Sequence, residues 1–120
     1  MVEFTLPVPE KFSTNKAYSG IHWAVRKKLK DLYHQSILPY KGKHYLGSYP
    51  VVITYSFVWV KHPLDTTNET YMVKMLEDGM VHAGILPDDD PKHVAETRIR
   101  SRKGDGDYVT ISIEPDYLPA

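Results

Sequence analysis

Apolar side chains alternate most regularly over residues 51–60. Every second residue there is large and apolar, and a strand would place these residues on one face: Val51, Ile53, Tyr55, Phe57 and Trp59. The residues between them include Val52, Val58 and Val60, so the second face is apolar as well. Strands that are apolar on both faces are covered on both sides, and this pattern therefore predicts a central strand.

Three shorter segments also have the composition of strands. They cover residues 2–8, 93–102 and 108–114. Pro7 and Pro9 close the first of them, and the turn Gly104-Asp-Gly106 joins the other two. In the last segment we expect three apolar residues to face inward: Val109, Ile111 and Ile113.

A helical period runs through residues 17–38, and Pro39 ends it. Apolar residues fall near one face of this predicted helix: Ile21, Val25, Leu29, Leu32 and Ile37. Basic residues occupy the other side: Arg26, Lys27, Lys28 and Lys30. The segment that follows, 40–49, is a polar, basic loop rich in tyrosine.

The second predicted helix spans residues 67–84, with Gly84 as the residue that ends it. Its apolar stripe contains large and small residues: Met72, Met75, Leu76, Gly79, Met80 and Ala83. The small residues would allow another element to approach closely. Together with the aromatic strand 51–60, this apolar surface exceeds what a two-layer monomer needs, and it predicts a homodimer.

The predicted order of elements is β-α-β-α-β-β. This order favours an α/β (α+β) fold in two layers, with two helices on a four-stranded mixed sheet. The chain of 120 residues is expected to form one domain, 1–120, that buries a core without disulfides, since it has no cysteine. No apolar run is long enough to span a membrane, and the first residues lack the pattern of a secretion signal, so we expect a cytoplasmic protein.

Charge is unevenly distributed, although the net charge is zero. Residues 11–61 contain nine Lys and Arg against one acid, and residues 62–90 contain seven acids against one lysine. Residues 91–103 are basic again, with five Lys and Arg against one acid. Basic segments of this kind are typical of proteins that bind a polyanion, while the acidic centre has the composition of a cation site. The alternative is that folding disperses these blocks and leaves no patch.

Acidic residues stand at both ends of the predicted helix 67–84. Asp65 precedes it, and Asp88-Asp-Asp90 follow it. Local structure alone accounts for both groups, because Thr66-x-x-Glu69 has the pattern of a capping box and Pro87–Pro91 that of a turn. A turn needs only one carboxylate, however, and oxygen ligands of this type also suit Mg²⁺. Both interpretations remain open at this point.

The stretch from Leu64 to Lys92 resembles the RusA family of Holliday junction resolvases, which are crossover junction endodeoxyribonucleases, in its phage or prophage form. The residues that carry the resemblance are Asp65-Thr-Thr67-Asn68, Lys74, Asp78, His82-Ala-Gly84 and Asp88-Asp89. Phe4-Thr-Leu-Pro-Val-Pro9 is similar to the opening strand of that family, and the predicted element order also matches its fold.

The resemblance implies a homodimer that cuts a four-way DNA junction with Mg²⁺, or with Mn²⁺ in its place. Asp65, Asp89 and Lys74 match catalytic residues of the family, and the metal ligands implied are Asp65 and Asp89 with Asp88 or Asp90 nearby. We expect Asp65 and Asp89 to converge in one acidic pocket, contributed by one or both subunits. Thr67 departs from the pattern, because the family has a second Asp there; Glu69 or Asp90 is the candidate replacement.

The basic segments are the candidate contacts to the DNA backbone. The residues concerned are Lys27, Lys28, Lys30, Lys41, Lys43, Arg98, Arg100, Arg102 and Lys103. Three functional hypotheses follow: a metal-dependent endonuclease for branched DNA, a pseudo-resolvase that binds junctions but has lost cleavage through Thr67, and an unrelated interaction module. Cleavage of a four-way junction separates the first from the second.

Overall fold

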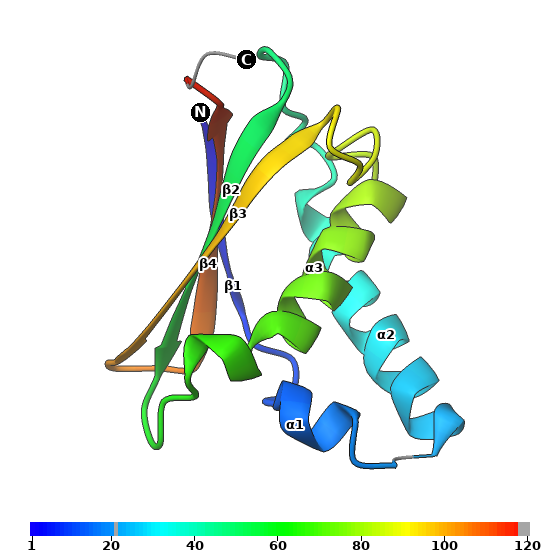
Figure 1. The fold of residues 1–120 in the computed structure, drawn as a ribbon, viewed down its shortest axis with the longest axis vertical. Helices are drawn as coiled ribbons and strands as arrows, with labels where there is room; N and C mark the ends of the chain where they lie inside the picture. The colour runs from blue at the N-terminus through cyan, green and yellow to red at the C-terminus, as the bar shows by residue number, and fades with distance from the viewer. Residues whose placement is uncertain (21, 118–120) are drawn as a thin grey trace.

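A mixed four-stranded sheet and one layer of helices make up the computed structural model, which describes residues 1–20 and 22–117 (Figure 1). The elements follow in the order β1 (Val2–Pro7), α1 (Thr14–Ala17), α2 (Trp23–Ile37), β2 (Val51–Trp59), α3 (Thr70–His82), β3 (Val94–Lys103) and β4 (Tyr108–Pro115). Two short 3₁₀ turns, η1 (Leu38–Tyr40) and η2 (Thr66–Asn68), lie after α2 and before α3. The predicted two-layer α/β class is confirmed, and α1 is an addition to it.

The strands lie in the order β1-β4-β2-β3, so β2 is central as its pattern predicts. It pairs antiparallel with β4 and parallel with β3, and Tyr55 lies opposite Ile111 on one side and Ile99 on the other. A parallel neighbour requires a crossover, and α3 provides it between β2 and β3. β1 pairs antiparallel with β4 at one edge of the sheet, and β3 forms the other edge.

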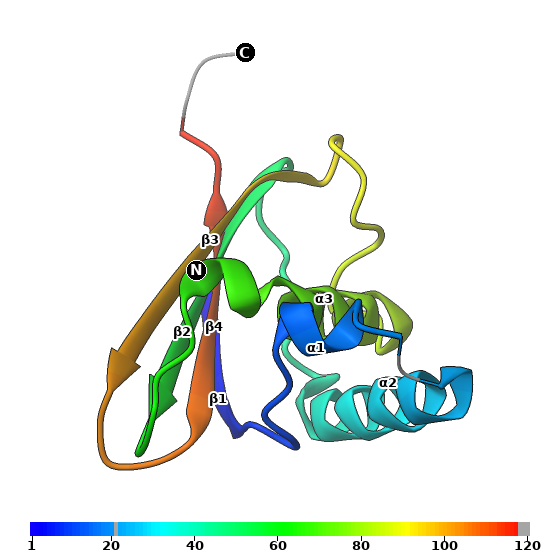
Figure 2. The same cartoon turned by 60° about the horizontal axis from the view of Figure 1, so that its bottom comes forward.

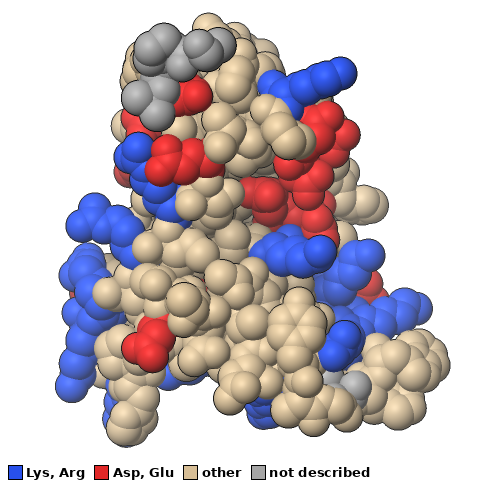
Figure 3. All heavy atoms as spheres, viewed as in Figure 1, with Lys and Arg blue, Asp and Glu red and all other residues tan. Residues whose placement is uncertain are grey.

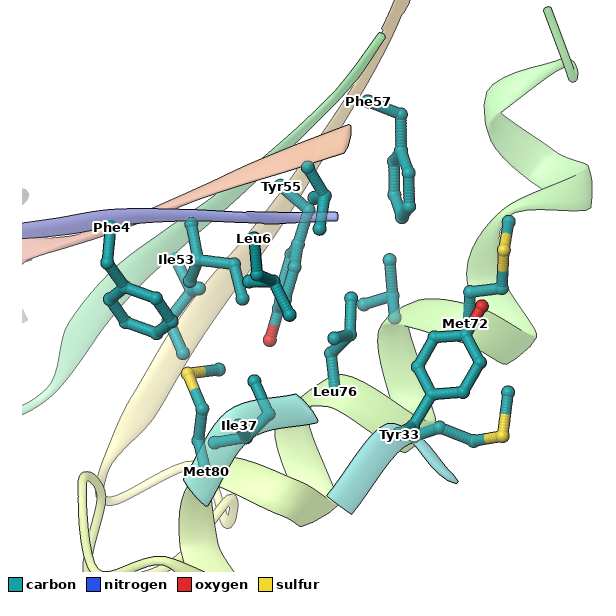
Figure 4. Packing of buried hydrophobic residues seen from close by; sticks show 14 of the residues in the cluster. Phe4, Leu6, Tyr33, Ile37, Ile53, Tyr55, Phe57, Met72, Leu76 and Met80 are labelled. Carbon is teal, nitrogen blue, oxygen red and sulfur yellow. The ribbon is translucent and has the colours of Figure 1, made fainter. Parts of the chain in front are cut away.

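The helices cover only one face of the sheet (Figure 2). Because side chains alternate along a strand, every second residue of β2 and β4 points toward them. Ile53, Tyr55 and Phe57 meet Leu76 and Met80 of α3 in this core (Figure 4). The further labelled core residues come from β1, α2 and α3: Phe4, Leu6, Tyr33, Ile37 and Met72.

The opposite face of the sheet has no helix over it, and its middle rows are polar. Thr54 and Ser56 of β2 lie there, in register with Ser112 and Thr110 of β4. Rows of paired residues run across the strands, and on β3 these two rows end in arginines: Arg98 lies beside Thr54, and Arg100 lies beside Ser56. The middle of this face presents hydroxyl and guanidinium groups, while Val52 and Val58 flank it on β2 and are at most 4% exposed.

The first predicted helix differs from the observed one in its start and in its buried face. The chain breaks after the short α1, and α2 begins only at Trp23. Leu29, Tyr33 and Ile37 form its buried side, while Val25 and Leu32 are 45% and 39% exposed. The prediction that Val25 and Leu32 face the core is therefore wrong; a spacing of four residues through Tyr33 selects a different face. Ile21, also expected on that face, lies outside the described residues.

The apolar stripe of α3 is buried in the core of the same chain. Met72, Met75, Leu76 and Met80 are all at most 4% exposed, because they pack against the sheet and α2. The surplus apolar surface that predicts a homodimer is therefore not present on α3, and that argument is wrong. Among the described residues, no helix has both the length and the apolar character that crossing a bilayer requires.

Candidate nucleic-acid interface

A groove between α2 and α3 collects basic side chains from both helices. Its widest part is a pocket of about 530 Å³ lined by Tyr18, Arg26, Lys27, Lys30, Tyr71, Lys74, Met75 and Asp78. Lys30 comes from α2 and Lys74 from α3, and both are exposed. The space-filling view shows these basic side chains gathered over the two helices, directly below an acidic group (Figure 3). The groove can hold an anion between two helices.

Arg26 and two tyrosines form one wall of this groove. The guanidinium of Arg26 donates from Nη2 to the carbonyl of Ala17 and lies over the ring of Tyr18, 5.7 Å from its centroid. Its Nε is buried and has no hydrogen-bond partner among the described residues. Tyr71 meets Tyr18 edge-on at 6.1 Å, and Tyr18 is 69% exposed. Basic groups beside an exposed aromatic ring are the two components with which proteins hold single strands of nucleic acid.

The groove continues into an acidic end. A second pocket of about 280 Å³ is lined by Lys30, His34, Asp78, Val81, His82 and Asp89. Lys30 and Asp78 belong to both pockets, so the basic and acidic parts are adjacent. His34 and His82 stack at 5.4 Å in this part, and burial is the main cause that lowers the pKa of His34.

Below the acidic end, Tyr55 and Glu77 form a partly buried pair. The hydroxyl of Tyr55 donates to Glu77 Oε1 at 3.0 Å. Burial raises the pKa of Glu77, and the negative charges of Asp89 and Asp78 raise it further, while the bond from Tyr55 opposes them. Glu77, Asp78 and Asp89 are therefore electrostatically coupled at the C-terminal half of α3.

The acidic turn after α3 uses two of its three carboxylates for local structure. Asp88 Oδ1 accepts the amide of Asp89 at 2.8 Å. Asp90 Oδ1 contacts Nδ1 of His93, and this bond lowers the pKa of Asp90. Asp89 has no such role and faces the pocket with Asp78. Turn chemistry thus accounts for Asp88 and Asp90 but leaves Asp89 unexplained.

At the other end of α3 the predicted capping box is absent. Glu69 does not reach back to the backbone of Thr66, and neither Asp65 nor Glu69 forms a side-chain cap. Instead Glu69 is fully buried, and its Oε2 accepts the indole Nε1–H of Trp59 at 2.8 Å. Burial raises the pKa of Glu69 to about 7, against the hydrogen bond from Trp59. The prediction fails because the large indole of Trp59 offers a buried donor that the local sequence does not reveal.

The other carboxylate oxygen of Glu69, Oε1, is buried and accepts no hydrogen bond from the described residues. The Ser101 hydroxyl lies close enough to lower the pKa of Glu69, but it donates to the carbonyl of Leu64 at 2.7 Å. A hydroxyl has a single proton, and the geometry assigns it to Leu64. Glu69 is thus a structural acid in the protein interior, and it is not available as an exposed replacement for the missing Asp at Thr67.

The structure separates Asp65 from Asp89 within one chain. Asp65 precedes η2 and Asp89 follows α3, and a helix of thirteen residues is about 20 Å long. Figure 1 shows these segments at opposite ends of α3. Among the described residues, no group of three or more His, Asp or Glu is placed to hold a metal ion. The residues of one chain therefore do not fit the Mg²⁺ site that the resemblance implies, and only a second subunit could bring Asp65 to Asp89.

The nine predicted DNA contacts fall in three places. Lys27, Lys28 and Lys30 lie on α2, but Lys28 faces away from the groove, beside Asp31 and Gln35. Lys41 and Lys43 are exposed in the loop whose His44 bonds to Gly84, beyond the end of α3. Arg98, Arg100 and Arg102 lie on the uncovered face of the sheet, and Lys103 ends that strand. They do not form one continuous surface.

Several residues of the groove escaped the sequence-based selection of site residues. Tyr18 and Tyr71 belong to it because of how α1 and α2 are joined, which the pattern did not predict, whereas Arg26 is one of the basic residues expected on the first predicted helix. Asp78 carried a usable signal, since it follows Lys74 by four residues and helical spacing places such residues together. No family model matches this chain, and the comparison with curated proteins found no match. The resemblance to the RusA family therefore rests on the motifs in its sequence.

Proposed function

We propose that this chain binds the sugar–phosphate backbone of branched DNA and acts as a resolvase-type endonuclease of low activity. The observation that carries the proposal is the convergence of Arg26, Lys27, Lys30 and Lys74 in one groove. Among the described residues none of these four forms an ion pair with an acidic residue. Their positive charge is therefore available to a ligand, and a phosphodiester chain is the polyanion that an elongated basic groove fits.

The groove also has the polarity that such a ligand requires. Phosphates would lie against Lys27, Lys30 and Lys74, and the exposed ring of Tyr18 would stack on a base at the branch point. Asp78 and Asp89 would then stand at the end of the bound strand. Contacts of this kind read the backbone and not the base edges, so binding would depend on DNA shape and salt and little on sequence.

The endonuclease part of the proposal depends on a dimer. Asp65 and Asp89 can share one cation only across a subunit interface, because α3 separates them within a chain. A two-fold dimer would also match the two-fold symmetry of a four-way junction. We therefore propose a homodimer as the active species.

A second candidate function is junction binding without cleavage. Two observations favour it: the absence of a metal-binding group among the described residues, and the exposed, uncharged Thr67 where the RusA pattern has an Asp. A site with one carboxylate fewer holds Mg²⁺ less tightly. This pseudo-resolvase would keep the basic groove and lose the chemistry.

Cleavage of a labelled four-way junction tests the two candidates. The reaction contains wild type or Asp89→Asn, with Mg²⁺ or Mn²⁺, and junction binding is measured in parallel in EDTA. Slow, paired cuts that disappear in Asp89→Asn support the endonuclease. Binding without cuts supports the pseudo-resolvase, and neither binding nor cuts contradicts both.

A further inference from the structure

Two arginines on the uncovered face of the sheet have no partner in the described part of the chain. Arg98 is paired, since its Nε lies 3.0 Å from Glu96 Oε1. Arg100 and Arg102 are exposed, and neither side chain forms an ion pair or a hydrogen bond with any described residue. They stand two residues apart on β3, so their side chains leave the same face about 7 Å apart along the strand.

A shallow hollow lies between these two guanidinium groups. Its volume is about 340 Å³, and its lining consists of Ser56, Phe57, Arg100, Ser101, Arg102 and Thr110. The hydroxyls of Ser56 and Thr110 come from neighbouring strands in register with Arg100. Thr110 Oγ1 is joined to Thr5 Oγ1 at 2.9 Å, while the Ser56 hydroxyl has no partner among the described residues. Two cations and two hydroxyls therefore surround one hollow.

We infer that this hollow is a second phosphate-binding site and that the uncovered sheet face holds a separate segment of nucleic-acid backbone. Arginine suits a phosphodiester because its planar fork can give two parallel hydrogen bonds to one phosphate. Hydroxyls of Ser and Thr are common further donors to phosphate oxygens. The inference rests on the proposed function in one respect, namely that the polyanion is DNA.

Charge on this face favours a polyanion over a second copy of the chain. Two acidic residues of the face, Glu96 and Glu114, lie beside Val52 toward the other end of the sheet, and a third, Glu3, lies opposite Ser112 at the β1 edge. The row through Ser56 contains Arg100, Thr110 and Thr5, the row through Val58 contains Arg102 and Tyr108, and neither row contains an acid. Stable interfaces between identical subunits are apolar at their centre, and this hollow is lined mainly by polar residues.

The sheet-face site and the groove between the helices lie on different sides of the domain. Arg100 and Arg102 leave the sheet on the face opposite the helices, whereas Lys30 and Lys74 lie in the groove between the helices. A straight duplex can lie against only one of these faces at a time. A branched DNA has arms in several directions, and one arm can lie in the groove while another crosses the sheet. Two basic faces on one small domain would thus select branched DNA by shape.

The test compares wild type with the double variant Arg100→Ala/Arg102→Ala by fluorescence anisotropy of a four-way junction over a series of salt concentrations in EDTA. Arg98→Ala is the matched control: Arg98 is a candidate DNA contact by sequence, but its pairing with Glu96 in the structure leaves Arg100 and Arg102 as the free arginines of this strand. Thermal melting checks that each variant is folded. A second variant, Ser56→Asp, keeps both arginines and places a carboxylate in the hollow.

We expect the double variant to bind the junction at least tenfold more weakly. The slope of log K against log salt should fall by about 1.8, as expected for two lost phosphate contacts. Ser56→Asp should weaken binding in the same direction, and Arg98→Ala should change affinity less than twofold. Unchanged affinity and slope in both the double variant and Ser56→Asp would overturn the inference. So would an equal loss in Arg98→Ala, or a changed oligomeric state of the double variant, which would assign the face to a second copy.

These outcomes are separable from those of the proposed function. If Lys30→Ala/Lys74→Ala abolishes junction binding and the arginine variant does not affect it, the sheet-face site is wrong and the groove stands. If binding needs Arg100 and Arg102 but no junction is cut, the sheet-face site stands and the endonuclease is wrong. A wild type that binds no DNA overturns both.

Discussion

Trp59 and Glu69 are joined by a buried hydrogen bond of 2.8 Å from the indole Nε1–H to the carboxylate. The bond ties the last residue of the central strand β2 to the residue immediately before α3. Lys11 lies over the same indole, with Nζ 4.9 Å from the ring centroid, and donates to the carbonyls of Lys61 and His62. The segment that carries Asp65 and Thr67 is therefore held at one end by the Trp59–Glu69 bond and at the other by Lys11, which itself lies over the Trp59 ring.

The first prediction is that the burial of Glu69 makes stability depend on pH. The pKa of Glu69 is about 7 in the folded protein and ordinarily 4.5, so the folded state keeps a proton that the unfolded state has released between these values. The stabilisation from this group is full below pH 4.5 and is lost as the pH rises through about 7. Glu69→Gln removes the titration. Its free energy of unfolding should match that of wild type near pH 4.5 and exceed it at pH 8 by on the order of 3 kcal/mol.

Urea unfolding at the two pH values measures this difference. Glu3→Gln, which changes an exposed glutamate on β1, is the control and should behave like wild type at both. An advantage of Glu69→Gln that is equal at both pH values would contradict the assigned titration.

A second prediction concerns the pair under the acidic end of the groove. Tyr55→Phe keeps the buried ring and removes the only hydroxyl that donates to Glu77 among the described residues. A partly buried carboxylate without its donor should lower the free energy of unfolding at pH 7 by about 1–3 kcal/mol. Chemical denaturation measures the loss, with Tyr18→Phe as the control, since that hydroxyl has no hydrogen-bond partner among the described residues. A loss no larger than that of the control would mean that the Tyr55 bond contributes nothing.

Thr67→Asp should raise cleavage of a four-way junction above the weak or absent activity of wild type. The substitution restores the carboxylate of the RusA pattern at an exposed position of η2, next to the N-terminus of α3, which tolerates an anion. The carbonyl of Thr67, which accepts the Thr70 hydroxyl, is unaffected. Thr66→Asp adds the same charge one residue away and should not raise cleavage. Robust cleavage by wild type with no gain in Thr67→Asp would show that another residue supplies the ligand.

The state of association is a further prediction. Analytical ultracentrifugation at micromolar concentration should give the mass of a dimer of the 13.8 kDa chain. The reason is the separation of Asp65 from Asp89 along α3, which only a second subunit can bridge. A monomer under these conditions, with or without junction DNA, would remove the paired-cut mechanism and leave DNA binding as the remaining part of the proposal.

The sequence predicted the sheet better than the helices. Alternation along a strand is local, so the central position of β2 and the inward residues Val109, Ile111 and Ile113 are observed as expected. The buried face of α2 depends on which helix residues meet α3, and Tyr33 displaced Val25 and Leu32 from the face that periodicity alone selects. Likewise Glu69 is buried and does not cap a helix because its carboxylate accepts a hydrogen bond from Trp59, which lies ten residues earlier in the chain, at the end of β2.

For the site, the charge pattern identified the basic segments as candidate contacts to a polyanion, but it did not show which of their side chains share a face. Arg98, Arg100 and Arg102 alternate with Ile99 and Ser101, and this spacing alone places the arginines on the face opposite the core. The spacing of these residues therefore predicts the face they share. The meeting of Lys30 with Lys74 depends on the packing of α2 against α3, which no local pattern contains.

The most direct test of the central claim is the affinity for a four-way junction relative to a linear duplex of the same sequence, measured by anisotropy in EDTA. Wild type is compared with Lys30→Ala/Lys74→Ala, which removes one lysine from each wall of the groove, and with Lys28→Ala, which removes an α2 lysine that faces away from it. We predict that wild type binds the junction at least tenfold more tightly than the duplex. The groove variant should lose most of this affinity and about 1.8 of the salt slope, and Lys28→Ala should resemble wild type. Equal affinity for junction and duplex, or the same loss in Lys28→Ala as in the groove variant, would contradict the claim.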